Sequence, residues 1–200
     1  MNNRIRRIAF VASQIALTLS AVCSAPPAHA AGETTALTNV IALVAERLSL
    51  ATPVAQYKWL NSKPITDVPR EKQVLADVVG HATTQGVDPA FARAFFADQI
   101  EASKMVQQQL FDQWHASGAP KKPAPDLATD VRPKLDHLDA TLIQALARVT
   151  PVRNAPDCPS QLAESLANWK QLTKFDSSEA DALMRALSHV CEAGGVAVQG

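Results

Sequence analysis

An all-α fold is predicted from this sequence on three observations. Apolar residues recur at helical rather than alternating spacing in nearly every segment, only seven of the 200 residues are glycine, and aromatic residues make up 5% of the chain. Because 47% of the residues are apolar and 19% are charged, the chain is long and apolar enough for one globular domain with a real core. We therefore expect a single-domain bundle of six helices.

The first 30 residues have the features of a cleaved signal peptide. Arg4, Arg6 and Arg7 precede an apolar run over about residues 8–22, and Ala28-His29-Ala30 fits the small-x-small pattern of a signal-peptidase site. We expect cleavage after Ala30, which leaves residues 31–200 as the folded domain. Such a protein would be periplasmic or secreted.

Two other fates of this segment stay open. A membrane anchor is the first, but the apolar run is interrupted by Ser13 and Gln14 and is shorter than the roughly 20 residues that span a bilayer. A lipoprotein attached through Cys23 is the second, and it is disfavoured because Val22 is bulkier than the small residue such processing needs. Cleavage removes three basic residues and no acidic one, so the formal charge changes from zero to −3. This charge points to no nucleic-acid partner and no membrane partner after cleavage.

Three helices are expected in the first half of the chain. The first spans about residues 38–61, with Pro53 inside it. The second helix is expected to begin with Asp67 as its N-cap and Pro69 in its first turn. An aspartate followed by a proline repeats this pattern at the start of the third helix. The second and third helices are expected over residues 67–85 and 88–115.

Three more helices are expected in the second half. The loop "ASGAPKKPAPD" has low helical tendency and precedes a fourth helix, which begins near Thr129 or Asp130 and tolerates Pro133 in its first turn. This helix ends at Thr150-Pro151. The two closing helices are shorter and are expected over residues 160–174 and 178–191.

Two cysteines, Cys158 and Cys191, remain after signal cleavage. In an exported chain a disulfide is favoured over a metal site, since no second cysteine pair or histidine cluster lies at ligand spacing. The bridge would join the two terminal helices and act as a staple without a redox role.

Cations and amides on helix faces are the candidate functional residues, because the sequence has no metal motif, phosphate-binding glycine loop or nucleophile elbow. Arg47 and Lys58 are eleven residues apart, which is three helical turns, so their side chains point the same way about 16 Å apart. Pro53 lies between them and is expected to bend the helix and tilt both cations toward a common point. The alternative is a pair of solvated surface charges.

Other candidates lie on the later helices. Ser103 and Gln107 stand at i and i+4, so their polar tips share a helix face. This pair is equally consistent with a polar contact between helices. Arg70 and Arg132 lie in the first turns of the second and fourth predicted helices, where the helix dipole favours anions. A cation there does not stabilise its own helix, which suggests that each arginine has another function.

Three stretches of the sequence resemble the secreted, all-helical chorismate mutases, the exported gamma subclass of that fold. They are "ERLSLATPVAQYKWLNSKPITDVPRE", "DQIEASKMVQQQLFDQW" and "PDLATDVRPKLD". The resemblance runs from about Ile41 to the second cysteine, with its motifs in the right order. It implies an isomerase that rearranges chorismate to prephenate with no covalent intermediate, cofactor or metal.

The resemblance also assigns roles to the cations and to one amide. Arg47 and Arg132 match arginines that hold the two substrate carboxylates, and Arg70 matches a third in the same pocket. Lys58 and Gln107 match the two groups that donate hydrogen bonds to the breaking ether oxygen, which gains negative charge in the transition state.

Three further residues match positions around the substrate. Ser103 corresponds to a small hydroxyl residue beside a carboxylate. Asp67 and Glu71 correspond to positions that contact the ring hydroxyl, although some secreted members have an apolar residue in place of Glu71. The exported subclass builds each site within one chain and often dimerises, which implies a homodimer here.

Two rival functions stay open at this point. The first is a non-catalytic exported helical module that binds an anionic ligand or a protein partner. It is disfavoured because the five cation and amide positions are all intact. The second is an isochorismate pyruvate lyase on the same fold, which the pocket cations alone do not separate from a mutase.

Overall fold

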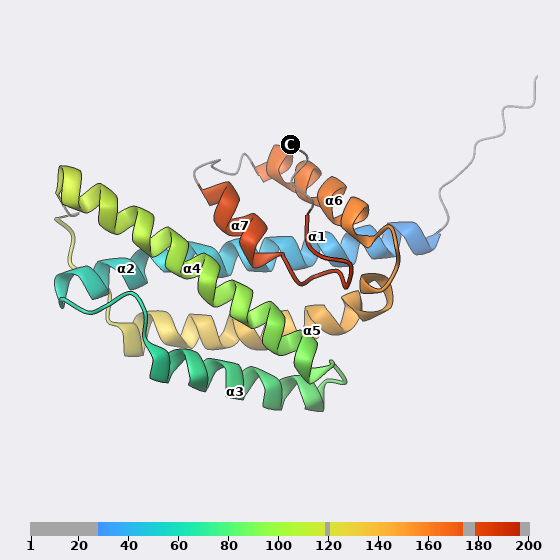
Figure 1. Cartoon of the computed structure of the whole chain (residues 1–200), viewed down its shortest axis with the longest axis horizontal. Helices are drawn as coiled ribbons and strands as arrows, with labels where there is room; N and C mark the ends of the chain where they lie inside the picture. Colours follow the sequence, from blue (N-terminus) through green and yellow to red (C-terminus); the bar gives the residue numbers. More distant parts are fainter. Residues whose placement is uncertain (1–27, 119–120, 174–178, 197–200) are drawn as a thin grey trace, which may run out of the picture.

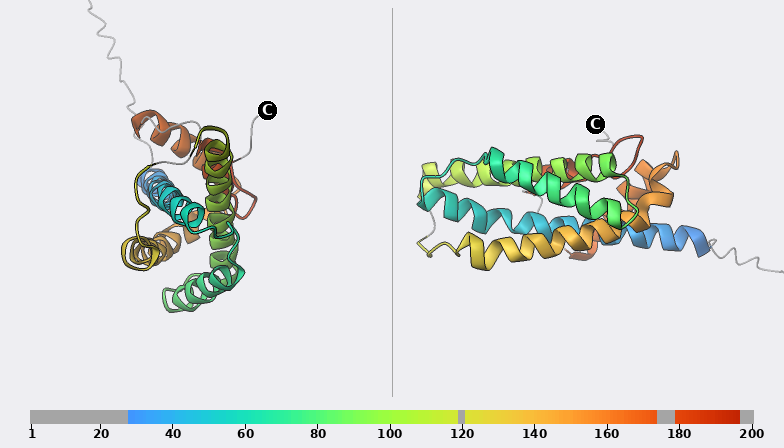
Figure 2. Two further views of the ribbon diagram at one scale, coloured as in Figure 1. Left: turned by 90° about the vertical axis from the view of Figure 1, so that its left-hand side faces the viewer. Right: turned by 90° about the horizontal axis from the view of Figure 1, so that it is seen from below.

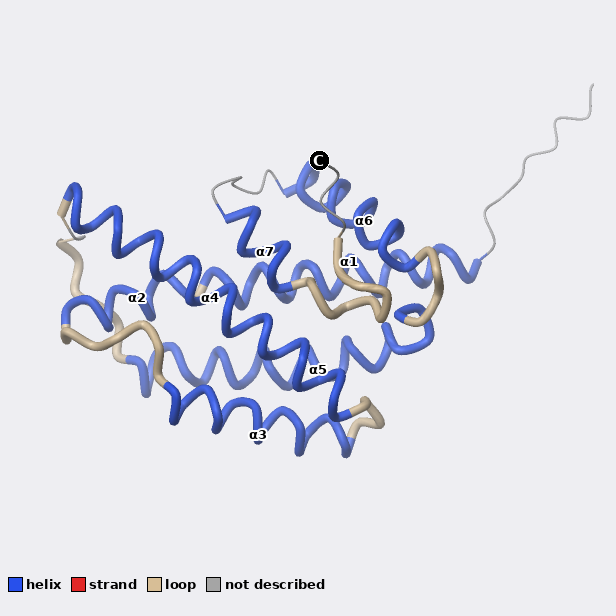
Figure 3. Tube along the Cα trace, viewed as in Figure 1, coloured by secondary structure: helices blue, strands red, loops and turns tan. Residues whose placement is uncertain are grey.

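The computed structural model describes residues 28–118, 121–173 and 179–196, with side chains from Gly32 onward. Helices joined by loops make up these residues, and no strand occurs among them (Figure 3). The elements are α1 (Ala28–Ser49), α2 (Ala51–Leu60), α3 (Val68–Thr84), α4 (Pro89–Ser117), a π-helical turn η1 (Leu127–Val131), α5 (Arg132–Arg153), α6 (Cys158–Thr173) and α7 (Ala180–Ala186). The predicted all-α class is confirmed, and each of the six predicted helices has a counterpart. Residues 1–27 of the expected signal segment lie outside the described range.

The predicted first helix is interrupted and starts earlier than expected. It begins at Ala28 instead of residue 38, and among residues 32–37 only Leu37 is buried. It breaks at Leu50, where α1 ends and α2 begins. Pro53 explains the break, since it has no N–H to bond the Ser49 carbonyl four residues earlier and its ring crowds that carbonyl.

The long α1–α2 segment lies in the middle of the molecule (Figure 1). Helix α5 packs along one side of α1, and α6 and α7 pack on the other. Helix α4 crosses the bundle and contacts α2, α3 and α7 (Figures 1 and 2). Residues far apart in the sequence are therefore gathered around the α1–α2 segment.

The apolar face of α1 forms the centre of the core. Leu37, Val40, Ile41 and Val44 are fully buried there, together with Phe95 of α4. By length and composition, the stretch Gly32–Leu60 resembles a membrane-spanning helix. In this fold its apolar composition is accounted for by burial against α5 and α6.

Capping side chains set where three of the helical elements begin. The Asp67 side chain accepts a hydrogen bond from the Arg70 N–H at the start of α3, and Asp88 does the same for Phe91 at the start of α4. Both predicted caps are confirmed. The fourth predicted helix starts earlier than expected, because Asp126 accepts hydrogen bonds from the next backbone N–H groups and opens η1.

A disulfide joins Cys158 to Cys191, as expected, and both cysteines are buried. Cys158 begins α6, whereas Cys191 lies beyond the end of α7. The predicted last helix is too long, since α7 ends at Ala186 and the chain continues in turns. These turns bring Cys191 back to the start of α6.

Candidate active site

A cavity of about 120 Å³ lies among α1, α2, α3, α4, η1 and α5. It is far larger than the roughly 10–15 Å³ that one water needs, so it can hold a small organic molecule. All eight predicted site residues line it: Arg47, Lys58, Asp67, Arg70, Glu71, Ser103, Gln107 and Arg132. Apolar side chains from the same elements, including Val54, Ile100 and Val131, form the rest of its wall.

Arg47 is a buried cation on the last turn of α1. Its Nε donates to the Asp139 Oδ1 of α5 over 2.6 Å, and the two side chains are only 7% and 9% exposed. Its guanidinium carbon also lies 6.0 Å from the centre of the Phe96 ring. A buried charge with such a partner has little freedom to move, so Arg47 is held at the cavity wall.

Lys58 is half-buried on the last turn of α2, where its ammonium donates to the carbonyl oxygen of Ile65. The chain turns back here because the N–H groups of Ser62 and Lys63 bond to the carbonyls of Trp59 and Lys58, with Ser62 at φ 50°. This helix end brings the Ile65 loop over the lysine.

Burial lowers the pKa of Lys58 below its ordinary value of 10.5. The negative charges of Asp67 and Glu71 act in the opposite direction, and the nearby Lys104 adds to the lowering. Lys58 is therefore the cation of this cavity whose charge is sensitive to alkaline pH.

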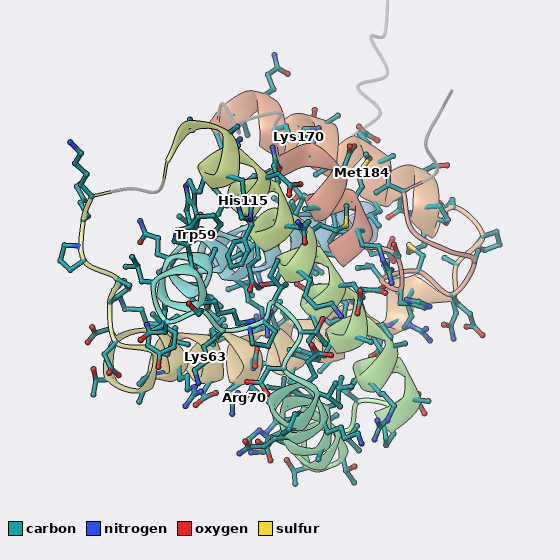
Figure 4. All side chains as sticks on the ribbon, turned by 60° about the vertical axis from the view of Figure 1, so that its left-hand side comes forward. Trp59, Lys63, Arg70, His115, Lys170 and Met184 are labelled. Atoms are coloured by element: carbon teal, nitrogen blue, oxygen red, sulfur yellow. A yellow bond between two sulfur atoms is a disulfide. The ribbon has the colours of Figure 1, made fainter. Side chains whose placement is uncertain are left out.

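The first turn of α3 presents Asp67, Arg70 and Glu71 to the cavity. Glu71 accepts a hydrogen bond from the Asp67 N–H over 3.3 Å and lies 3.8 Å from the Lys104 ammonium. Arg70 extends from this turn to Asp136 of α5, with 3.1 Å between Nη2 and Oδ1 (Figure 4 labels Arg70). The capped turn thus places one cation and two carboxylates at the cavity.

Ser103 and Gln107 share one face of α4, as their spacing predicted. The Gln107 Nε2 donates to the Ser103 Oγ over 3.0 Å. Gln107 is only 3% exposed, and its Oε1 has no hydrogen-bond partner in the described part of the chain. An unpaired buried oxygen beside a cavity indicates a site built for a polar ligand.

Arg132, the first residue of α5, is exposed at the edge of the cavity. Among the described residues no carboxylate pairs with it within 4.0 Å. It also lines a neighbouring hollow with Tyr57 and Lys63. This exposed, unpaired guanidinium is available to an anion that enters from solvent.

Trp59 fixes the direction of α2 from the side away from the cavity. Its ring packs edge-on against Phe111 and Trp114 of α4, with centroid distances of 5.1 Å and 5.6 Å, and it also contacts His115 (Figure 4). Such edge-to-face packing is stabilising and directional. Trp59 therefore holds α2 against α4, next to the cavity-lining Lys58.

Sequence reasoning missed two charged residues of the cavity, Lys104 and Asp139. It also missed Asp136, the partner of Arg70. Helical spacing could have indicated the two aspartates, because Asp136 and Asp139 follow Arg132 at i+4 and i+7 and so share its face of α5. Lys104 directly follows Ser103 and stands at i, i+3 to Gln107, a spacing that also could have indicated it.

The cavity has a positive charge balance. Five cationic side chains line it against three carboxylates, an excess of two positive charges. Within the described residues, no three His, Cys, Asp or Glu side chains form a group that could hold a metal ion. The arrangement suits an organic dianion.

Comparisons with known proteins agree on one family. The model of the chorismate mutase type II family matches residues 38–108. The secreted chorismate mutase of Mycolicibacterium smegmatis is 34% identical over 175 residues, which cover 86% of this chain and 96% of that protein. The secreted chorismate mutase of Mycobacterium tuberculosis is 31% identical over 168 residues, which cover 84% of each.

A solved structure shows the same relationship at higher identity. The crystal structure of a chorismate mutase from Burkholderia thailandensis is 62% identical in sequence and superposes with a TM-score of 0.76. The match covers 78% of this chain and 99% of that one.

Proposed function

The chain belongs to the type II chorismate mutase family, and we propose that its cavity binds chorismate and directs the rearrangement to prephenate. The observation that carries this proposal is the single cavity lined by all eight predicted residues, with an excess of two positive charges. Chorismate is a dianion with two carboxylates, so its charge complements that of the cavity.

The reaction breaks one carbon–oxygen bond while one carbon–carbon bond forms in the same molecule. The protein has to hold the substrate with the two reacting carbons close together and stabilise the negative charge that develops on the ether oxygen. Fixed cations and hydrogen-bond donors provide both.

In the proposed complex the arginines hold the carboxylates. Arg47 and Arg132 each bind one, and Arg70 lies beside them. The planar guanidinium suits a carboxylate because it donates two parallel hydrogen bonds. Because Arg47 is buried and Arg132 is exposed, the supported orientation of the substrate places one carboxylate deep in the cavity and the other near its mouth. Ser103 contacts a carboxylate from α4.

Lys58 and Gln107 are the proposed catalytic residues. They lie on different helices, α2 and α4, and both line the cavity. Nε2 of Gln107 carries two hydrogens and gives one to Ser103, which leaves the other for the ether oxygen. The Lys58 ammonium would leave the Ile65 carbonyl or share its donors with the same oxygen.

Asp67 and Glu71 are proposed to contact the ring hydroxyl. Both are held in place by the first turn of α3, through the hydrogen bond of Glu71 to the Asp67 N–H. A carboxylate oxygen of Glu71 can accept a hydrogen bond from the ring hydroxyl, and the Lys104 ammonium lies 3.8 Å from the same side chain.

The direct test incubates the purified protein, without added metal, with chorismate and follows its loss together with the appearance of prephenate. We expect turnover that Lys58→Ala reduces at least about a hundred-fold, the general scale for removing one preorganised donor. Intact helical circular dichroism without turnover would contradict the proposal. A parallel assay with isochorismate tests the lyase, which would release pyruvate.

Export and assembly complete the proposal. The protein is secreted or periplasmic, in line with its secreted relatives, and we propose that signal peptidase cleaves after Ala30. The mass of the protein recovered from the periplasm or the medium tests the cleavage site. We also propose a homodimer with one complete site per chain, as the resemblance to the exported subclass implies. Light scattering over a range of concentrations tests it.

A further inference from the structure

Helix α5 carries three charged residues on one stripe that meets the cavity. Arg132, Asp136 and Asp139 lie at i, i+4 and i+7 and so share one face. Arg132 lines the cavity itself, whereas each carboxylate pairs with an arginine from another helix. Asp139 holds Arg47 of α1, and Asp136 holds Arg70 of α3.

The two pairs differ sharply in burial. The side chains of Arg47 and Asp139 are 7% and 9% exposed, whereas those of Arg70 and Asp136 are 25% and 64% exposed. An exposed pair is screened by water and couples weakly. A buried pair depends on its partner, because removal of one charge leaves the other desolvated and unpaired. Asp139 therefore constrains its arginine far more strongly than Asp136 does.

The contacted atom matters for the chemistry. Asp139 accepts from Nε of Arg47, so it occupies the side of the guanidinium nearest the helix. The two terminal nitrogens are left to form the planar, two-donor edge that a carboxylate prefers. Phe96, 6.0 Å from the guanidinium carbon, further limits how the group can move.

The Asp139 carboxylate is already engaged by a cation of the cavity. Its side chain is only 9% exposed and its Oδ1 lies 2.6 Å from Nε of Arg47, so it faces the guanidinium although it lines the cavity. Its presence there is explained if it acts through Arg47. We propose that Asp139 is a positioning residue, which orients the terminal nitrogens of Arg47 toward a substrate carboxylate, and that Asp136 does the same weakly for Arg70. This inference rests on the proposed function.

The test compares three aspartate-to-asparagine variants, which keep side-chain shape and remove charge. We expect Asp139→Asn to raise KM about ten-fold or more with a smaller effect on kcat, because Arg47 contacts a carboxylate in both the ground state and the transition state. Asp136→Asn should change kcat/KM less than about five-fold, as for an exposed pair.

Asp98→Asn is the matched control. Asp98 is 1% exposed and pairs with Arg185 and His189 on the opposite side of α4, and it does not line the cavity. We expect this variant to lower the melting temperature while KM stays unchanged. A merely structural role of Asp139 would give the same result as Asp98→Asn, a lower melting temperature with wild-type KM, and that would overturn the proposal.

A second measurement separates this inference from the proposed function. In the substrate-free protein, the Nε–H signal of Arg47 in nitrogen-detected magnetic resonance should exchange slowly with water, and Asp139→Asn should make the exchange fast. If the wild-type protein does not turn over chorismate, the proposed function fails while this signal still tests the pair. Unchanged exchange in the variant would overturn the pairing.

A further variant covers the case in which Asp139→Asn does not fold. Asp139→Glu keeps the charge and moves it by one methylene group. We expect this variant to fold and to raise KM, because the guanidinium shifts with its partner. A folded Asp139→Glu with wild-type KM would overturn the proposal.

Discussion

The Nε2 atom of Gln107 donates to the Ser103 hydroxyl over 3.0 Å, while the Oε1 atom of the same buried amide lacks a hydrogen-bond partner in the described part of the chain. The hydroxyl fixes the plane of the amide, so the second hydrogen on Nε2 has a defined direction. An amide donates this hydrogen at any ordinary pH, whereas a carboxyl group donates only when protonated.

Gln107→Glu should therefore make the enzyme acid-favouring. We expect kcat/KM of the wild-type protein to be level as pH rises through 7, and that of the variant to fall over the same range as the carboxyl group ionises. Gln108→Glu is the control, because this variant introduces the same carboxyl group one residue away, on the exposed face of α4. A pH profile of Gln107→Glu that matches the wild type would argue against contact with the ether oxygen.

Lys58 should set the alkaline limit of activity. Burial lowers its pKa, so the protonated form is present below the lowered pKa and is lost at a pH below the ordinary 10.5. We expect kcat/KM to fall on this alkaline side, and Lys58→Arg, although less active, to lose this fall because a guanidinium stays protonated. Lys72→Ala, an exposed lysine outside the cavity, should leave the profile unchanged. The same alkaline fall in Lys58→Arg would assign it to another group.

Pro53→Ala should impair catalysis although it makes the α1–α2 segment more continuously helical. The new N–H can bond to the Ser49 carbonyl and join α1 to α2, which changes the spacing of Arg47 and Lys58. Because a displacement of about 1 Å can cost up to about a hundred-fold, we expect kcat/KM to fall about ten-fold or more. Pro151→Ala, inside α5 and exposed, is the matched control and should retain activity. Equal activity of both variants would mean that the break at Leu50 does not set the site geometry.

Loss of the disulfide should destabilise the fold without changing the chemistry. Cys158 and Cys191 are 33 residues apart, and a loop of this length corresponds to about 3–4 kcal/mol of unfolding free energy in the chain-entropy model. Urea unfolding of the Cys158→Ala/Cys191→Ala double variant measures the loss. We expect kcat/KM at 25 °C to be retained, because neither cysteine lines the cavity. An unchanged unfolding free energy would show that the bridge is dispensable.

Local chemistry explains the correct and the incorrect helix boundaries. Asp67 and Asp88 were found from sequence because their caps act within three residues. Asp126 caps in the same way, but the surrounding Pro-rich loop concealed it and the predicted start was placed a few residues too late. The start of α1 at Ala28 was not predicted, because residues 32–36 are not buried and so carry no apolar pattern that would mark a helix.

The sequence by itself determined the helical class, the capped helix starts, the cysteine pair and the set of cations on helix faces, since these depend on helical spacing and short-range hydrogen bonds. Only the tertiary structure decided how those faces meet. Arg47 and Asp139 are 92 residues apart, and their 2.6 Å contact exists because α1 packs on α5. Gln107 lies on α4, which contacts α2, α3 and α7, and it is buried with one oxygen unpaired among the described residues, while Asp139 of α5 is part of the cavity wall. Helical spacing specifies the face on which a side chain lies, but its partner follows from packing between distant segments.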